Sequence, residues 1–113
     1  MSIRRIAPGP RMSKAVVHGD TVYLSGHVAE GATVTEQARS IFQRIEALLA
    51  EAGTDKSKLL SAQIWLADIA TFDEMNAVWD AWIVPGQPPA RATVESRLAG
   101  PEYLIEISAI AAV

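Results

Sequence analysis

The C-terminal segment, residues 103–113, constrains the fold more than any other part of the chain. Its alternation is that of a β-strand, which places successive side chains on opposite faces. One face carries Tyr103, Ile105, Ile107, Ala109 and Ala111. The other carries Leu104, Ile110 and Ala112, and is interrupted by Glu106. A strand that is apolar on both faces must be buried on both faces of its sheet. If helices pack on one face, the other face must pack against another partner.

The remaining strands follow from β-rich runs bounded by turn residues. The runs on either side of His18-Gly19-Asp20 predict a hairpin. Leu59 to Leu66 is apolar on both alternating positions, which favours the centre of a sheet. The full set of predicted strands is 3–6, 15–17, 21–25, 59–66, 91–97 and 103–113.

Two helices are predicted from apolar residues spaced three and four apart. The first has the stripe Val34, Ala38, Ile41, Phe42, Ile45, Leu48, Leu49 and Ala52, with Gly53 as the residue that ends it. Thr71 and Glu74 predict a capping box at the start of the second. Its buried face is predicted to carry Phe72, Met75, Val78, Trp79 and Trp82, and the proline-rich stretch at 85–89 ends it. We expect all three tryptophans, Trp65 included, to lie in the core.

This order predicts one α+β domain over residues 1–113, a sheet with two helices on one face. The length of 113 residues suits a single domain. We expect the uncovered, partly apolar face of the sheet to pack against copies of the chain, with a closed ring as the simplest arrangement.

Composition excludes several classes of function. With no cysteine, disulfides and thiolate chemistry are excluded, and a reducing cytoplasm is the expected location. No apolar run is long enough to cross a membrane, and the N-terminus lacks the apolar core of a secretory signal. We therefore expect neither a membrane-spanning segment nor a secretory signal. The net charge of −3 does not provide the basic surface that nucleic-acid binding needs, so no nucleic-acid partner is expected.

Glu106 and Arg91 are the first candidates for chemistry. Glu106 interrupts an apolar strand, where a carboxylate must be paired, hydrogen-bonded, protonated or at a cavity. Arg91 follows Pro88-Pro89-Ala90, whose stiff backbone fixes its direction, and a guanidinium suits bidentate capture of a carboxylate. Taken singly, each residue type at such a position more often forms an ordinary ion pair. Together they form a minimal acid–base site, provided that the strand register brings them together, and the sequence leaves that register open.

Other polar residues add weaker signals. Ser25-Gly26, at a strand end, can offer a hydroxyl and a close backbone amide to a ligand, or can simply end the strand. His27 follows them and could line a pocket, while His18 is expected to face solvent in a turn. No His, Asp or Glu cluster has the spacing of metal ligands, so no metal site is expected. No cofactor motif is present either.

Two blocks of sequence resemble the C-terminal signature of the RidA/YjgF family. They are Pro89-Ala90-Arg91-Ala92-Thr93-Val94 and Ile105-Glu106-Ile107-Ser108-Ala109-Ile110-Ala111. Further matches are Gly9-Pro10, Val22-Tyr23-Leu24-Ser25-Gly26, Ala50-Glu51-Ala52-Gly53 and Asp68-Ile69-Ala70-Thr71-Phe72, so the resemblance spans nearly the whole chain.

The resemblance implies a chorismate-mutase-like fold and a homotrimer with a central barrel of sheets and a site in each cleft between subunits. It implies cofactor-free hydrolysis of reactive enamines and imines, such as 2-aminoacrylate, to 2-oxo acids and ammonia. Arg91 matches the arginine that binds the substrate carboxylate, and Glu106 matches the glutamate that positions or activates water. Ser25, Gly26 and the Thr93 backbone match positions that line the pocket.

The chain departs from the family pattern at several points, one of which is a short segment from His27 to Gly31. Arg11-Met12-Ser13 follows the Gly-Pro where an aromatic residue is common, Thr93 stands where a cysteine is frequent, and His27 where glutamine is common. Arg11 and His27 are therefore further candidates for contact with substrate. The alternative to an enzyme is a module on the same scaffold that binds a carboxylate metabolite through Arg91 without turnover.

Overall fold

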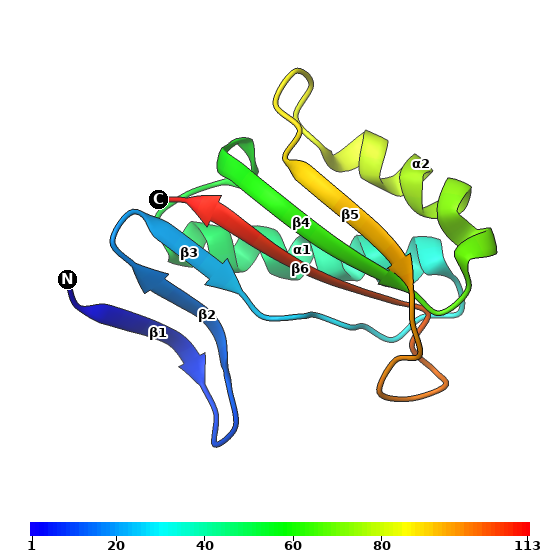
Figure 1. The fold of residues 1–113 in the computed structure, drawn as a ribbon, viewed down its shortest axis with the longest axis horizontal. Coiled ribbons are helices and arrows are strands. Elements are labelled where there is room, and N and C mark those ends of the chain that lie inside the picture. The colour runs from blue at the N-terminus through cyan, green and yellow to red at the C-terminus, as the bar shows by residue number, and fades with distance from the viewer.

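The computed structural model describes residues 1–113 and contains one six-stranded mixed sheet with two α-helices. The strands, in chain order, are β1 (Ile3–Pro8), β2 (Ser13–His18), β3 (Thr21–Leu24), β4 (Leu59–Leu66), β5 (Ala90–Glu95) and β6 (Ile105–Ala112). Their order across the sheet is β1-β2-β3-β6-β4-β5. Only β4 and β5 pair in parallel. The predicted strands are confirmed, with β6 and β4 in the interior of the sheet and β5 at an edge (Figure 1).

Both helices lie on one side of the sheet, as predicted. Helix α1 (Val34–Glu51) lies behind the central strands, and α2 (Phe72–Trp82) lies beyond β5 (Figure 1). The apolar stripe of α1 is buried, and Gly53 beyond its end has the positive φ of 88° that favours glycine. The helix begins at Thr33, whose Oγ1 accepts a hydrogen bond from the Glu36 amide.

The strand register assigns each residue of β6 to one face. Ile105, Ile107, Ala109 and Ala111 are buried beneath the helices, whereas the residues between them are half-buried on the open face. On that open face Glu106 of β6 lies opposite Trp65 of the neighbouring strand β4. Trp65 is therefore not a core residue, and that prediction was wrong because its strand position faces away from the helices. Tyr23 and Val94, 47% and 43% exposed, add to the apolar surface of the chain.

The start of α2 differs from the predicted capping box. Thr71 makes no side-chain cap; its hydroxyl donates to the Asp68 carbonyl, within a short 3₁₀ turn (Ile69–Thr71) that precedes the helix. The Glu74 carboxylate does not reach back to Thr71. It accepts from the backbone and hydroxyl of Thr35, both at 2.9 Å, and so joins the first turns of the two helices. Phe72 is 37% exposed rather than buried.

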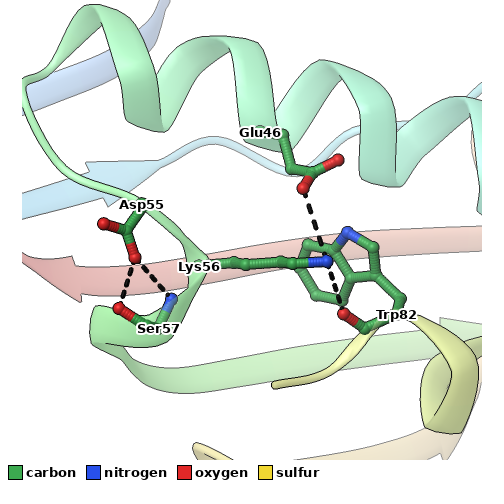
Figure 2. A network of polar contacts seen from close by, with 5 residues as sticks. All are labelled: Glu46, Asp55, Lys56, Ser57 and Trp82. Atoms are coloured by element: carbon green, nitrogen blue, oxygen red, sulfur yellow. Dashed lines mark hydrogen bonds and ion pairs between the residues drawn. The ribbon is translucent and has the colours of Figure 1, made fainter.

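The opposite ends of the two helices are joined through Lys56, in a 3₁₀ turn (Lys56–Lys58) that Asp55 caps (Figure 2). The Lys56 ammonium donates to the Trp82 carbonyl at 2.7 Å, pairs with Glu46 at 3.5 Å and lies over the Trp82 ring. Trp82 in turn stacks on Phe42 of α1, with ring centres 4.1 Å apart. The two helices therefore form one layer that is fixed at both ends. Neither is long and apolar enough to cross a membrane.

Candidate functional site

Glu106 is packed against a glycine. The segment after β3 continues beside β6, where His27 and Ile107 exchange two backbone hydrogen bonds of 2.8 and 3.1 Å. Gly26 lies just before this pair. A β-carbon at Gly26 would lie 2.2 Å from the Glu106 Oε2 atom, so only glycine leaves room for the carboxylate. The chain thus holds Glu106 at a defined place on the open face, next to exposed backbone.

Ser25 and His27 lie on either side of this glycine. The Ser25 hydroxyl donates to the Lys14 carbonyl at 3.2 Å and lies 3.3 Å from His27 Nε2. His27 is only 8% exposed. Burial lowers the pKa of His27, and the positive charges of Lys14 and Arg44 lower it further, against the opposing effect of a hydrogen bond to the Lys14 backbone. His27 is therefore a neutral imidazole at neutral pH.

Arg91 lies on the other face of the sheet, against α2. Its Nη1 atom donates to Met75 Sδ at 3.8 Å, and its Cζ atom lies 5.0 Å from the ring centre of Trp79 and 5.9 Å from that of Phe72. Cation–π contact and sulfur contact hold the guanidinium without using its charge on an acid. Arg91 has no carboxylate partner in the chain, where Lys56–Glu46 is the only ion pair.

Thr93 lies on the same face of β5, two residues after Arg91. Its side-chain oxygen is buried and has no hydrogen-bond partner in the chain. A buried hydroxyl without a partner is costly. Arg91 and Thr93 are therefore two neighbouring hydrogen-bonding groups on an edge strand: Arg91 has no acid partner, and the Thr93 hydroxyl has no hydrogen-bond partner in the chain.

The register separates the two principal candidates within one chain. Arg91 pairs with Ala62, which pairs with Ala109 on the helix-covered face. Glu106 pairs with Trp65, which pairs with Val94 on the open face. Because side chains alternate, Arg91 and Glu106 project from opposite faces of the sheet. The chain places Glu106 beside Gly26 on the open face, whereas His27, which pairs with Ile107, faces the helices with the Ser25 hydroxyl beside it; Arg91 and Thr93 form a separate group on β5.

Arg11 joins neither group: it is exposed beside the β1–β2 turn, whereas Met12 lines a cavity with Ser25, Gly26 and His27. Lys14 and Arg44 line the same cavity, and neither was predicted from the sequence. Nothing local marks them, because they come from a strand and a helix that only the fold places side by side. Gln37, also unpredicted, is fully buried and fastens the loops around it through Gly31, Glu102 and Leu104. No group of three or more His, Asp or Glu side chains is arranged to hold a metal ion.

The chain is similar along its whole length to one group of proteins. The family model described as Endoribonuclease L-PSP matches residues 2–113. The RutC family protein YoaB of Escherichia coli is 43% identical over 115 residues, with 100% of both chains covered. A RutC family protein of Haemophilus influenzae is 40% identical over 114 residues, with 98% of each chain covered.

Solved structures of family members have the same fold as this chain. A YjgF family member from Neisseria meningitidis superposes with a TM-score of 0.97 and 45% identity, covering 99% of this chain and 95% of that one. A family member from Mycobacterium tuberculosis superposes with a TM-score of 0.92 and 28% identity, covering 99% and 100% of the two chains. The predicted chorismate-mutase-like α+β fold is confirmed.

Proposed function

The chain belongs to the YjgF family, whose members also carry the names RutC and L-PSP, and from this premise we propose that it hydrolyses enamines and imines of small 2-imino acids. Water adds to the C=N carbon, the C–N bond breaks, and the products are a 2-oxo acid and ammonia. An enamine such as 2-aminoacrylate first takes up a proton at carbon and loses one from nitrogen to become the imine. Arg91 binds the substrate carboxylate, and Glu106 positions and activates the water.

The observation that carries the proposal is the state of Arg91. Its guanidinium is held by Trp79, Phe72 and Met75 yet has no acid partner. A fixed, unpaired guanidinium is suited to bidentate binding of a carboxylate. Thr93, with its unpartnered hydroxyl, lies on the same face of the same strand. This favours an anionic ligand at the β5 edge over the ordinary surface ion pair that the sequence also allowed.

The complete site is composite in this proposal. Since Arg91 and Glu106 project from opposite faces of one sheet, one protomer supplies Arg91 and Thr93, and a neighbouring protomer supplies Glu106, Ser25 and Gly26. The edge position of β5 leaves Arg91 free to meet a second copy. A homotrimer with three such clefts satisfies this requirement and covers the apolar open faces.

The chemistry needs few groups. An imine carbon is already electrophilic, so anchoring, one oriented water and proton transfer are sufficient. Glu106 accepts a proton from water as the C–O bond forms and returns it to the departing nitrogen. The backbone exposed at Gly26 and the Ser25 hydroxyl offer hydrogen bonds to the substrate beside it.

The first test is Glu106→Gln, with Glu30→Gln, an exposed glutamate outside the site, as the matched control. Imines are generated in the assay by an amino-acid oxidase, and hydrolysis is measured by competition with semicarbazide. We expect Glu106→Gln to lower turnover by roughly 100-fold or more, while binding of 2-oxobutyrate persists. Undiminished hydrolysis would refute the assigned role of Glu106.

Arg91→Ala is the second test, with Arg39→Ala as control. We expect it to weaken 2-oxobutyrate binding, measured by calorimetry, on the order of 100-fold, because a bidentate charged contact is lost. Wild-type affinity in Arg91→Ala would refute the anchor. Carboxylate binding by the wild type without any hydrolysis across a panel of imines would support the non-catalytic alternative instead.

A further inference from the structure

Three side chains of helix α2 lie beside the guanidinium of Arg91. The Met75 Sδ atom accepts a hydrogen bond from Nη1 at 3.8 Å, and the ring centres of Trp79 and Phe72 lie 5.0 and 5.9 Å from Cζ. Phe72, Met75 and Trp79 are three and four positions apart, so they occupy one face of the helix. No acidic side chain pairs with the guanidinium. The orientation of Arg91 is therefore set by one face of one helix, through uncharged groups.

Phe72 is the exposed member of this group. Its side chain is 37% exposed, and it belongs neither to the buried core nor to the cluster of rings that Phe42, Trp79 and Trp82 form. Exposure of a single aromatic residue is ordinary in itself. What distinguishes Phe72 is that its ring lies within cation–π distance of an arginine that has no acid partner. An aromatic group outside the core thus lies beside a cation that the fold does not neutralise.

Trp79 is the rigid member of the group. Its side chain is 6% exposed, and its ring packs against those of Phe42 and Trp82, with ring centres 6.0 and 5.9 Å away. Helix α2 is also held at both ends, at its start by the hydrogen bonds from Thr35 and at its end by Lys56, which donates to the carbonyl of the last residue (Figure 2). The indole beside the guanidinium therefore has a fixed position relative to both helices.

This kind of support has a physical consequence for binding. A free arginine side chain has many rotamers, and fixing one of them when a ligand binds lowers the affinity. A guanidinium that its neighbours already hold has lost part of that freedom beforehand. Aromatic contact does this without neutralising the charge, as an acid partner would. The N–H groups lie in the plane of the guanidinium, so contact with ring faces leaves them open to a bidentate carboxylate.

We propose that Phe72 and Trp79 are positioning residues that hold Arg91 in the orientation in which it binds the substrate carboxylate. This inference rests on the proposed function, since it concerns the anchor of the same site. The rings act through Arg91 and take no part in the chemistry. The carboxylate is bound before and during the reaction alike, so loss of positioning raises KM and leaves kcat nearly unchanged.

The first test measures binding of 2-oxobutyrate, a product-like carboxylate, by calorimetry with the assembled protein. Phe72→Leu and Trp79→Leu keep an apolar side chain but remove the ring. We expect the affinity to fall about threefold in Phe72→Leu and roughly tenfold in Trp79→Leu, because a cation–π contact is stronger where water is excluded. Phe72→Tyr and Trp79→Phe retain a ring and should stay within about twofold of the wild type.

Trp82→Leu is the matched control, because Trp82 belongs to the same helix and the same ring cluster, but its ring has Lys56 rather than Arg91 over it. This variant loses the same indole and should keep 2-oxobutyrate affinity within about twofold of the wild type. Thermal unfolding of every variant separates loss of fold from loss of affinity. An equal loss of affinity in Trp82→Leu and Trp79→Leu would show that the rings act only through packing, and would overturn the inference.

Kinetics give a second readout that a purely structural role would not produce. In the semicarbazide assay, Phe72→Leu and Trp79→Leu should raise KM by about the same factors, threefold and tenfold, with kcat within about twofold of the wild type. Glu106→Gln, by contrast, should lower kcat. A fall in kcat with KM unchanged in the two leucine variants would overturn the assignment.

Nuclear magnetic resonance of the arginine side chains observes Arg91 without any ligand. Its Nε–H signal is identified by its absence from Arg91→Lys. Ring currents of the two aromatic side chains should set this signal apart from those of exposed arginines, and Phe72→Leu and Trp79→Leu should each move it toward them. A signal that neither variant moves would show that the rings do not hold the guanidinium, and would overturn the inference.

Failure of this inference differs from failure of the function on which it rests. If Arg91→Ala loses 2-oxobutyrate binding while both leucine variants keep it, the carboxylate anchor stands and the positioning role is wrong. If the wild type binds no 2-oxobutyrate although its Arg91 signal is shifted by the rings, the anchor itself is wrong and the positioning role is overturned with it.

Discussion

The surroundings of Arg91 and Glu106 differ in how each charged group is held. Arg91 lies on an edge strand, where two aromatic rings and a methionine sulfur of α2 support it. Glu106 lies on an interior strand, against the one residue type that leaves room for it. The first arrangement holds a cation against α2 on the helix-covered face; the second holds a carboxylate at a fixed point on the open face. The difference teaches that the two candidate residues of one chain face away from each other.

Mixing two inactive variants tests this separation most severely. Co-expressed Arg91→Ala and Glu106→Gln chains should regain up to about a quarter of wild-type hydrolysis, since in random assemblies about one cleft in four receives both intact residues. A double variant carrying both changes in every chain is the control and should stay inactive. If co-assembled chains recover nothing, Arg91 and Glu106 do not act across subunits.

Gly26→Ala tests the Glu106 half alone. The new β-carbon would collide with the Glu106 carboxylate and displace it, and a displacement near 1 Å at a catalytic group can lower activity about 100-fold. Gly9→Ala is the matched control, because its nearest contact would be an ordinary 3.5 Å. The semicarbazide assay gives the activity, and thermal unfolding gives the stability. Full activity in Gly26→Ala would show that the position of the carboxylate does not matter.

The two faces of β6 should respond differently to substitution. Ile107→Ala, beneath the helices and 1% exposed, should lower the free energy of unfolding by about 2–5 kcal/mol through loss of core packing. Ile110→Asp, on the open face, should instead weaken self-association, seen by analytical ultracentrifugation, while circular dichroism shows the fold retained. An association unaffected by Ile110→Asp would argue against burial of that face between copies.

The smallest effect concerns pH. The pKa of His27 is lowered by burial and by Lys14 and Arg44, so the unfolded chain binds a proton more readily than the folded one. Stability should therefore fall as the pH drops below the ordinary histidine pKa of 6.5, and level off below the lowered value. His27→Gln should make this decline shallower in denaturant titrations at several pH values. His18→Gln, at an exposed turn, is the control and should leave the decline unchanged.

Much of the fold is accessible from local patterns. The stripe of α1, the hairpin of β2 and β3 and the two-sided apolar character of β4 and β6 follow from periodicity that the structure reproduces. The prediction of a capping box at Thr71 was wrong, because the Glu74 carboxylate accepts hydrogen bonds from Thr35, a residue 39 positions away in the sequence. Trp65 was misplaced for a similar reason, since its face depends on pairing with β6.

The residues of the candidate site also fall into those that the sequence marks and those that only the fold reveals. Glu106, Arg91, Ser25, Gly26 and His27 stand out in the sequence by residue type and by resemblance. Lys14 and Arg44 do not, because a strand and a helix distant in sequence must meet before their charges share a cavity. The unpartnered hydroxyl of Thr93 likewise becomes visible only when its surroundings are known.

By itself the sequence determined the helices, the strands and the family, because these depend on spacing between near neighbours and on short matched blocks. Only the tertiary structure decided which way Arg91 and Glu106 face. Side chains alternate along a strand, so the pairing of β5 and β6 with β4 fixes that choice, and a shift of one residue would reverse it. Pairing between distant strands is a property of the folded chain, and it is what places Arg91 and Glu106 on opposite faces.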